Sequence, residues 1–399
     1  MSGLKGLRNK VAIVGHAQSA TIRRPTETLG VTALRTAREA IADAAMTPRQ
    51  IDGFIAATML PSSGAHELED GISLVSAEWM AAHLGADPHL VAGFQGFGQI
   101  TGSLNIAINA LASGAVDYVL LHRALYNPPG RYNNNPMTHV AGWQQWNAPQ
   151  GFFGALPGIA LAYNEYMQRY GCTRETTARI AVEARKHGSR NPLSYWYGKP
   201  LTIEDYLAEP VLVDPMSRLD CDIPVQGVAA FVLTTAERAR DHPHKPVYIA
   251  GYANSYGSDR RLHLNWTLDE MEREGQALAA RLWEGTGYTA RDVQLPQLYD
   301  GFSPFIYVWL EALGYLPRGE AHQFVAEGGI DSDKPGAIPV LTGGGALGCG
   351  RLHGLPQLLE CYRQLAGRAG ERQRDVSVAL MTYSAPHIGG AVVYTNDPA

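Results

Sequence analysis

Two polar residues, Arg351 and His353, lie in a segment whose composition suits a ligand-binding loop. Residues 340–354 read VLTGGGALGCGRLHG, so six of these fifteen positions are glycine, and an apolar run begins directly after them. Glycine allows positive φ and a close approach of the backbone to a ligand, and a helix start aims free N–H groups at an anion. The segment predicts an active-site or ligand loop, although a glycine-rich connector would have the same composition.

The composition of the chain is that of an ordinary globular protein. Its 399 residues allow two domains, and 45% of them are hydrophobic and 18% charged. The net charge of −5 argues against nucleic acid as the main partner. Four cysteines without CxxC spacing indicate neither a zinc site nor a disulfide framework. No stretch has the length and apolarity of a signal peptide or a membrane span, so we expect a cytoplasmic protein without membrane contact.

The elements that must position these residues are expected to form a duplicated unit. Residues 11–19 and 247–255 share the pattern V-x-I-x-G-x-A-x-S. Residues 45–51 (AMTPRQI) and 287–293 (GYTARDV) correspond next, at an offset of 242 from Thr47 to Thr289. Two matches in the same order indicate that one α/β unit occurs twice.

A third correspondence lies near the end of each copy. Strands are expected at residues 117–121 and 375–380, each after an amphipathic helix, at residues 105–112 and 355–365 respectively. Strands that alternate with helices predict a largely parallel sheet with helices on both faces.

The two copies divide the chain into residues 1–240 and 241–399. We expect an inserted loop or lid region at about residues 125–215 of the first copy. Its beginning, residues 126–155, is rich in Asn, Pro, Gly and Trp, which is typical of loops. A long ordered loop usually serves as a lid or as a surface for a partner.

Five segments of the chain resemble the thiolase superfamily, and most closely its sterol-carrier-protein-type thiolases and lipid-transfer-protein aldolases. They are residues 178–192, 198–205, 218–222, 299–302 (YDGF) and 344–350 (GGALGCG). The resemblance covers essentially the full chain. It implies a thiolase-like α/β fold with two tandem βαβαβαββ halves in a five-layer α-β-α-β-α body and an inserted loop domain.

The catalytic positions of a thiolase are changed in this chain. The family's nucleophilic cysteine falls at or near Phe97, and its second cysteine falls close to Tyr383. The histidine of its Gly-His-Pro motif falls on Arg351, and the histidine of its His-Asp-Cys-Phe motif falls on Tyr299. Covalent acyl transfer needs an activated nucleophile and a base. The resemblance therefore implies that this chain is not a working thiolase.

Polar residues occupy the same loops, and the resemblance implies that they catalyse a retro-aldol cleavage. The related steroid side-chain aldolases use tyrosines, one of them in the motif that matches Tyr299. Such a reaction needs a base for the β-hydroxyl and a donor at the thioester oxygen. Because the pKa of a free tyrosine is ~10, we expect Arg351 beside Tyr299 to favour the phenolate. The candidate catalytic residues are Tyr299, Asp300, Arg351, His353 and Tyr383, and the candidate substrate-binding residues are Phe97, Gly344, Gly345 and Gly350.

Structural roles stay open for several of these residues. Tyr299 would also suit a buried position that caps a strand, and Asp300 would suit the cap of a following helix. His353 would equally suit a histidine at a helix start that bonds to the backbone. Cys221 and Cys349 are expected to be small buried apolar residues.

The function that these residues favour is that of an aldolase. It would cleave a β-hydroxyacyl-CoA thioester, of a steroid or similar side chain, without a cysteine nucleophile. A non-catalytic scaffold that binds acyl-CoA and an acyltransferase of altered mechanism are the alternatives. The resemblance further implies a homodimer and a zinc-ribbon/OB-fold partner protein in a heterotetramer. Because this chain has no zinc-ligand spacing, we expect no cofactor in it, and any zinc would belong to the partner.

Overall fold

The computed structural model describes residues 5–57, 69–94, 99–127, 144–152, 154–256 and 267–398. Within these ranges one nine-stranded sheet has the order β3-β2-β4-β7-β1-β8-β11-β10-β9, and β5 and β6 form a separate pair. The strands are β1 (Val11–Gln18), β2 (Gly53–Ala56), β3 (Leu90–Gly93), β4 (Tyr118–Tyr126), β5 (Val211–Val213), β6 (Met216–Ser217), β7 (Gln226–Thr235), β8 (Val247–Asn254), β9 (Leu295–Gln297), β10 (Val378–Tyr383) and β11 (Gly390–Thr395).

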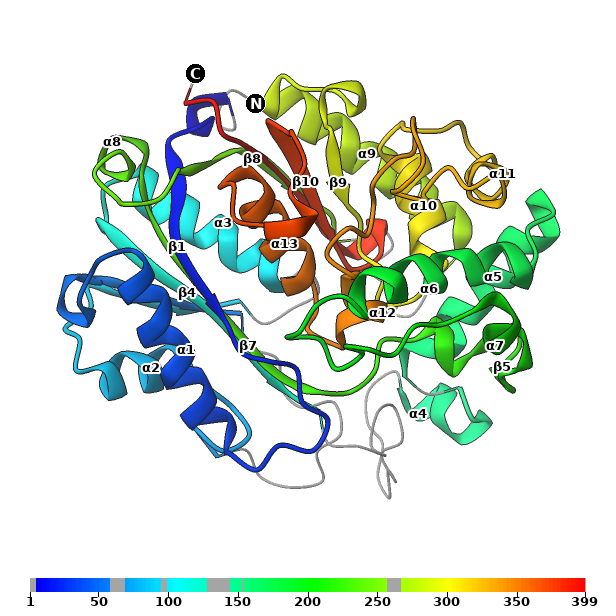
Figure 1. Cartoon of the computed structure of the whole chain (residues 1–399), viewed down its shortest axis with the longest axis horizontal. Coiled ribbons are helices and arrows are strands. Elements are labelled where there is room, and N and C mark those ends of the chain that lie inside the picture. The colour runs from blue at the N-terminus through cyan, green and yellow to red at the C-terminus, as the bar shows by residue number, and fades with distance from the viewer. Residues whose placement is uncertain are drawn as a thin grey trace.

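The helices cover both sides of the sheet and fill the space beside it (Figure 1). They are α1 (Leu29–Asp43), α2 (Ala77–Leu84), α3 (Gln99–Ala112), α4 (Gln144–Asn147), α5 (Ala155–Tyr170), α6 (Arg174–Gly188), α7 (Ile203–Ala208), α8 (Ala236–Ala239), α9 (Leu268–Thr286), α10 (Phe305–Ala312), α11 (Ala321–Ala326), α12 (Gly345–Cys349) and α13 (Leu355–Leu365). None of these described helices combines the length and the apolar composition needed to cross a lipid bilayer.

The expected duplication is confirmed by the equivalent places of β1 and β8. Both strands have eight residues and the same order of buried and half-buried positions. They lie next to each other in the middle of the sheet and pair antiparallel, Ala12 with Tyr248 and Ile13 with Val247. On one side of this pair follow β7, β4 and β2, and on the other follow β11, β10 and β9.

The pairing makes the sheet mixed, whereas the sequence predicted a largely parallel one. Parallel pairs join β2 to β3, β2 to β4 and β9 to β10. The last strand of each half runs antiparallel to a neighbour from the same half, β7 beside β4 and β11 beside β10. A short connection between neighbouring strands permits only the antiparallel arrangement, and the turn at residues 384–389 is such a connection.

The second half differs from the expected βαβαβαββ order. Among the described residues it has no strand that corresponds to β3. At that place, beside the end of β9, the backbone N–H of Leu298 donates to the carbonyl oxygen of Val340 at 3.3 Å. Pro339 precedes Val340, and a proline cannot donate to a sheet ladder.

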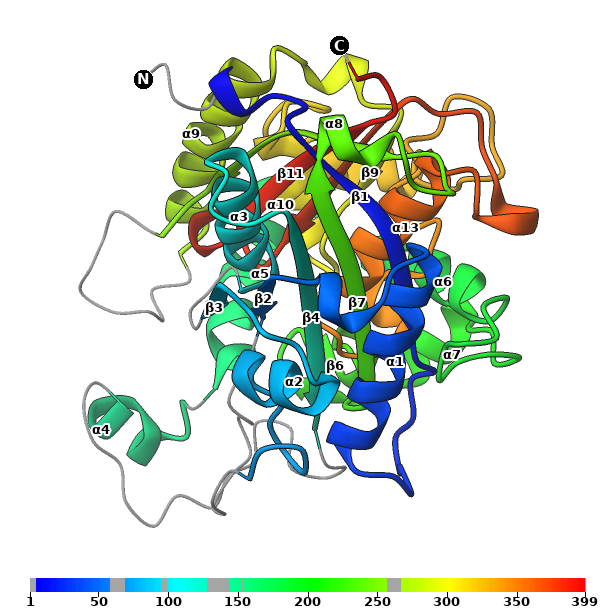
Figure 2. The same cartoon turned by 90° about the vertical axis from the view of Figure 1, so that its left-hand side faces the viewer.

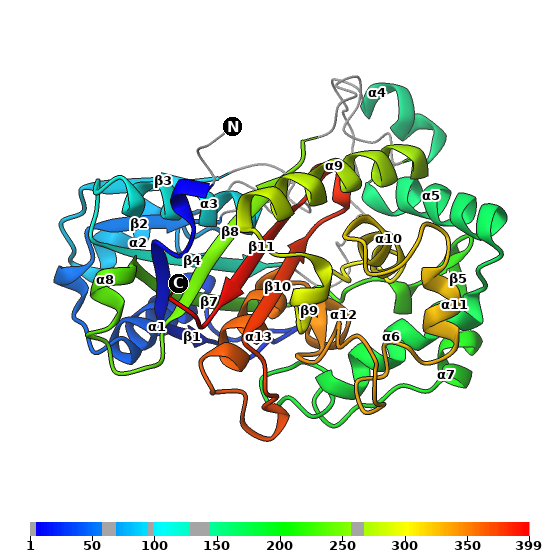
Figure 3. The same ribbon diagram turned by 90° about the horizontal axis from the view of Figure 1, so that it is seen from above.

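The layers agree with a thiolase-like body. Helices α1 and α2 pack on the outer face of the first half of the sheet, where Figure 2 shows them in front of the strands. Helix α9 covers the outer side of β8 and β11, as Figure 3 shows from above. Helix α3 packs against strands of both halves, and α13 packs against β9, β10 and β11. The N-terminal ends of α3 and α13 meet, because a Cβ on Gly354, the residue before α13, would contact Ile100, the second residue of α3.

The insertion lies between β4 and β7 and contains α4 to α7 with the β5–β6 pair. Its helix α6 packs against α11 and α12 of the second half (Figure 1). Most of the loop at residues 126–155 lies outside the described residues. The domain limits at residues 240 and 241 stay a prediction, because one continuous sheet runs across them.

Candidate active site

Tyr299 and Tyr383 lie side by side at the ends of two neighbouring parallel strands. Strands β9 and β10 pair Leu295 with Ala379 and Gln297 with Met381. Two residues further along the same register, Tyr299 and Tyr383 contact each other with ring centroids 5.0 Å apart. Both side chains are buried, and the backbone N–H of Tyr299 donates to Thr382 Oγ1 at 2.8 Å. Because parallel strands end at one edge, the fold places both phenols at a single point.

Arg123 enters this point from the other half of the molecule, and the sequence analysis did not identify it. It is 1% exposed and lies in β4. One guanidinium nitrogen, Nη1, donates to Ala57 O at 2.7 Å, and Nη2 lies 2.8 Å from Nδ1 of His353. Burial lowers the pKa of Arg123, while the nearby phenols of Tyr299 and Tyr383 act in the opposite direction. The site therefore has an arginine beside the two tyrosines.

Arg351 supplies a second buried guanidinium from the glycine-rich segment. Its Nη1 donates to Asn127 Oδ1 at 2.7 Å, and its backbone N–H donates to Ile223 O at 2.8 Å. Burial raises the pKa of Tyr383 to about 12, although Arg123 and Arg351 both favour its phenolate. Tyr383 is therefore protonated at neutral pH and suits the role of an acid.

His353 is held in an unusual backbone conformation next to these groups. Its φ is 48°, in the left-handed region that non-glycine residues rarely adopt. The expected bond from His353 to backbone is not the one that forms, because its Nδ1 contacts the Arg123 guanidinium instead. Burial holds the pKa of His353 well below its ordinary value, and the charges of Arg351 and Arg123 add to the effect. Strain of this kind gathers at functional sites.

The N-terminal part of α3 faces the same point. A Cβ at Gly354 would meet the Tyr383 ring and the side chain of Ile100, the second residue of α3. The helix is longer than the expected 105–112 and begins at Gln99. Phe97, the expected counterpart of the thiolase nucleophile, lies outside the described residues.

The carboxylate of Asp300 caps the short helix α12. Its carboxylate accepts the backbone N–H of Ala346 at 2.6 Å and of Leu347 at 3.1 Å, and Gln357 Nε2 donates to it at 2.8 Å. Burial raises the pKa of Asp300 to about 7, against the effect of the backbone hydrogen bonds. These bonds match the capping role that the sequence left open for Asp300, and its catalytic role stays a prediction.

The three candidate substrate-binding glycines pack against protein atoms. A Cβ on Gly345 would overlap the Asp300 carboxylate, and one on Gly350 would overlap Val225. Gly344 has φ 95° and lies against Gly188 of α6. Close packing therefore accounts for glycine at these positions, and their contact with a substrate stays a prediction.

A buried carboxylate in the insertion holds the loop that carries Tyr299. Asp220 is fully buried and accepts from Tyr206 Oη, from Ser303 Oγ and from Ser217 N. The backbone N–H of Ser303 donates to Asp220 O at 3.0 Å. Asp220 therefore ties the insertion to the turn that directly follows Tyr299.

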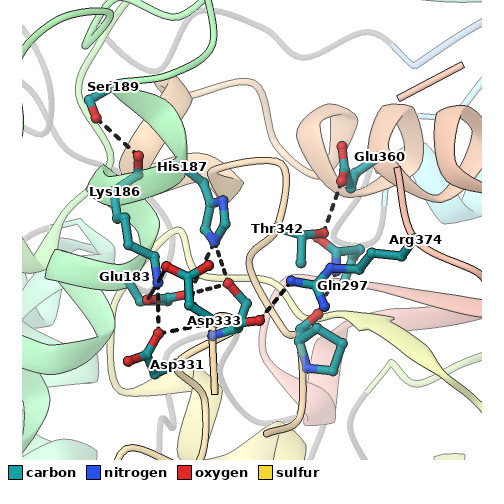
Figure 4. Close-up of polar contacts among 12 residues, drawn as sticks. Glu183, Lys186, His187, Ser189, Gln297, Asp331, Asp333, Thr342, Glu360 and Arg374 are labelled. Carbon is teal, nitrogen blue, oxygen red and sulfur yellow. Dashed lines mark hydrogen bonds and ion pairs between the residues drawn. The ribbon is translucent and has the colours of Figure 1, made fainter. Parts of the chain in front are cut away.

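A polar cluster fixes α6 to the segment before α12 (Figure 4). Glu183 accepts from Ser332 Oγ at 2.8 Å and contacts His187 Nε2 at 3.0 Å. Lys186 Nζ lies 2.8 Å from both Glu183 Oε2 and Asp331 Oδ1. Burial alone would raise the pKa of Glu183, but hydrogen bonds from His187 and Lys186 outweigh it and lower the pKa to about 2.

The cluster predicts an acid-sensitive contribution to stability. The folded-state pKa of Glu183 lies below the unfolded value near 4.5, so its ionised form stabilises the fold above that pH. We expect this contribution to be on the order of 3 kcal/mol at pH 7 and to disappear as the pH falls towards 2. Urea unfolding of Glu183→Gln against the unchanged protein, at several pH values, measures it. Glu175→Gln, on the exposed first turn of α6, is the control, and a pH-independent difference for Glu183→Gln would contradict the assignment.

The described residues contain no group of three or more His, Cys, Asp and Glu side chains placed to hold a metal ion. The polar groups that converge are thus two phenols, two guanidiniums and one imidazole. Together they can move a proton and stabilise negative charge on oxygen.

Comparisons with known proteins agree with this fold. Residues 266–393 match the family described as thiolase C-terminal domain-like. The chain is 31% identical over 353 residues to the 17-hydroxy-3-oxo-4-pregnene-20-carboxyl-CoA lyase of Mycobacterium tuberculosis, covering 86% of this chain and 88% of the relative. It is also 31% identical over 357 residues to the steroid side-chain-cleaving aldolase of Thermomonospora curvata, covering 86% and 87%.

A solved structure extends the similarity to almost the whole chain. The structure of an Ltp2–ChsH2(DUF35) aldolase superposes with a TM-score of 0.82 at 28% identity and covers 98% of both chains. The chain therefore belongs to the thiolase superfamily, in the family of thiolase-like lyases that includes these two relatives.

Proposed function

We propose that this chain cleaves a β-hydroxyacyl-CoA thioester of a steroid or similar side chain by retro-aldol chemistry. The observation that carries the proposal is the buried group of Tyr299, Tyr383, Arg123 and Arg351, which contains no cysteine. Its relatives are named as a carboxyl-CoA lyase and a side-chain-cleaving aldolase. A site with acid, base and cationic groups but no nucleophile suits this bond cleavage better than acyl transfer.

The residues have separate roles in the proposed reaction. Tyr299 takes the proton from the β-hydroxyl as a phenolate, which we propose the charge of Arg351 favours. The bond between Cα and Cβ then breaks, and the β carbon becomes the carbonyl carbon of a ketone. The electron pair of the broken bond forms the enolate of the thioester. The proton returns from Tyr299 to Cα, which releases the shortened acyl-CoA and restores the phenolate. Tyr383 stays protonated and donates to developing negative charge.

The direct test is turnover of a synthetic steroid β-hydroxyacyl-CoA. We expect equal amounts of ketone and shortened acyl-CoA, measured by liquid chromatography and mass spectrometry, with no free CoA consumed. Products that appear only when CoA is added would indicate thiolysis instead. If the thioester binds but is not cleaved when every partner protein is present, the result would support the alternative of a non-catalytic scaffold that binds acyl-CoA.

Assembly is part of the proposal. The similar solved structure is that of an Ltp2–ChsH2(DUF35) aldolase, and it supports a partner protein for this chain. We propose a homodimer that binds a zinc-ribbon/OB-fold protein as a heterotetramer, with no cofactor in this chain and any zinc in the partner. Light scattering of the chain alone and of the co-expressed pair distinguishes these states. A stable, active monomer would contradict both parts.

Activity should survive thiol alkylation. The described cysteines are free, and three of them, Cys172, Cys349 and Cys361, are buried. Burial raises the pKa of Cys349 to about 12 and the pKa of Cys361 well above its usual value, so little thiolate is present at neutral pH. We expect iodoacetamide at pH 7 to leave kcat nearly unchanged. Stoichiometric inactivation that substrate prevents would return the site to a thiolase-type mechanism.

A further inference from the structure

The contact between Arg123 and His353 determines which imidazole nitrogen carries the proton. Nη2 of Arg123 lies 2.8 Å from Nδ1 of His353. A guanidinium has only N–H donors, so Nδ1 must be the acceptor and must lack a proton. The single proton of the neutral ring is then on Nε2. The arginine is itself fixed, because its Nη1 donates to Ala57 O at 2.7 Å.

The ring is also kept uncharged. His353 is 5% exposed, and both Arg123 and Arg351 lie close enough to oppose a positive charge on it. Among the described residues, none is hydrogen-bonded to Nε2. His353 thus offers one neutral N–H donor, next to the Tyr383 ring, whose centroid is 6.1 Å from that of the imidazole.

We propose that Arg123 is a positioning residue that fixes the Nε2–H tautomer of His353, and that His353 donates this N–H to the thioester oxygen as the enolate forms. The inference rests on the proposed function, since it assigns a second donor, besides Tyr383, to the oxygen that gains charge when the Cα–Cβ bond breaks. The electron pair of that bond ends on this oxygen, and no proton leaves His353 in the step. A neutral imidazole can polarise a carbonyl in this way.

The backbone of His353 supports the same role. A residue at φ 48° places its side chain where an ordinary helix start would not. Such a conformation persists only where the surrounding structure holds it, and it is common at functional sites. Donors fixed before the reaction need no reorganisation when charge develops, and the loss of one typically lowers kcat by about 10²–10³-fold.

Four variants test the assignment through kcat and KM. His353→Ala is expected to lower kcat by about 10²–10³-fold with little change in KM. Arg123→Met removes the donor to Nδ1 and is expected to lower kcat by at least about tenfold. Arg123→Gln and Arg123→Lys each retain an N–H donor, so both should recover part of that loss. Arg185→Met is the control, because it removes another buried guanidinium, which packs over Trp196 instead.

A spectroscopic readout separates positioning from simple structural support. In protein with ¹⁵N-labelled histidine, the resonances absent from His353→Ala belong to His353. We expect an unprotonated Nδ1 and a protonated Nε2 in the unchanged protein without substrate, and a mixed tautomer in Arg123→Met. A proton on Nδ1 in the unchanged protein overturns the proposal, as does an Arg123→Met enzyme with unchanged kcat. If Arg123→Met fails to fold, Arg123→Gln and Arg123→Glu are compared instead. A kcat of Arg123→Gln that is no higher than that of Arg123→Glu overturns the proposal.

The two proposals fail in different ways. An unchanged protein that does not cleave the thioester overturns the proposed function and the donor role of His353 together. The histidine spectrum needs no substrate, so the positioning of His353 by Arg123 is decided by it alone.

Discussion

Tyr299→Phe is expected to lower kcat by about 10²–10⁴-fold while the fold remains intact. The substitution removes one oxygen, and the ring keeps its contacts with Tyr383 and with Phe305, whose centroid lies 6.2 Å away. The substitution removes the group that takes the β-hydroxyl proton and returns it to Cα. Steady-state kinetics with the synthetic thioester, together with a thermal unfolding curve, measures both effects.

Arg351 variants test how that base is activated. Arg351→Lys keeps the charge but not the planar fork, so it should cost less activity than Arg351→Met. If Arg351 favours the phenolate, Arg351→Met also moves the rising limb of the pH–rate profile to higher pH. Tyr315→Phe is the matched control for Tyr299→Phe, because it removes a buried hydroxyl that has no hydrogen-bond partner among the described residues. A Tyr299→Phe enzyme with normal kcat would remove Tyr299 from the mechanism.

Asp220→Ala is expected to lower the free energy of unfolding by about 3–5 kcal/mol. The change leaves the buried donors of Tyr206, Ser303 and Ser217 without their acceptor. Unpaired donors in the interior lose their bonds to water without replacement. Urea unfolding followed by fluorescence measures the loss.

Asp205→Ala is the matched control for Asp220→Ala. Asp205 lies on the exposed first turn of α7 in the same insertion, so its loss should cost less than about 1 kcal/mol. Equal losses for the two variants would show that the buried network adds nothing. Because Ser303 follows the Tyr299 turn closely, we also expect kcat to fall in Asp220→Ala at temperatures where the protein stays folded.

The repeated pattern at residues 11–19 and 247–255 was sufficient to predict two equivalent strands. The pattern of residue types within a strand or a helix is a local property of the sequence. For the same reason residues 355–365 form α13 with the expected limits. The direction of β7 and β11 could not be predicted in this way, because antiparallel pairing depends on where the chain returns. The partners of Asp300 could not be predicted either, since Ala346 and Leu347 are distant from it in the sequence.

Arg123 had a signal in the sequence that the analysis did not use. A lone arginine within the apolar strand YVLLHRALY is costly to bury unless it has a function or partners. The internal duplication of the chain also points to Arg123. Gly53 pairs with Val119 in the first half as Leu295 pairs with Ala379 in the second, and Gly53 and Leu295 are related by the same offset of 242 as Thr47 and Thr289.

Four residues further along these strands, Ala57 corresponds to Tyr299 and Arg123 corresponds to Tyr383. The hydrogen bond from Arg123 to Ala57 O is thus the first half's counterpart of the contact between the two tyrosines. One copy of the duplicated edge supplies the phenols, and the other supplies the cation that faces them.

The narrow junction between β1 and β8 gives this division a practical meaning. The two strands meet through the pairs Ala12–Tyr248 and Ile13–Val247, and residues 240–246 connect α8 to β8. Arg123 is on one side of this junction, and Tyr299, Arg351 and His353 are on the other. Neither fragment of a chain opened in the connection would hold a complete set of catalytic groups. Turnover by a mixture of the two would therefore report fragment complementation, with the reaction itself as the reporter of docking.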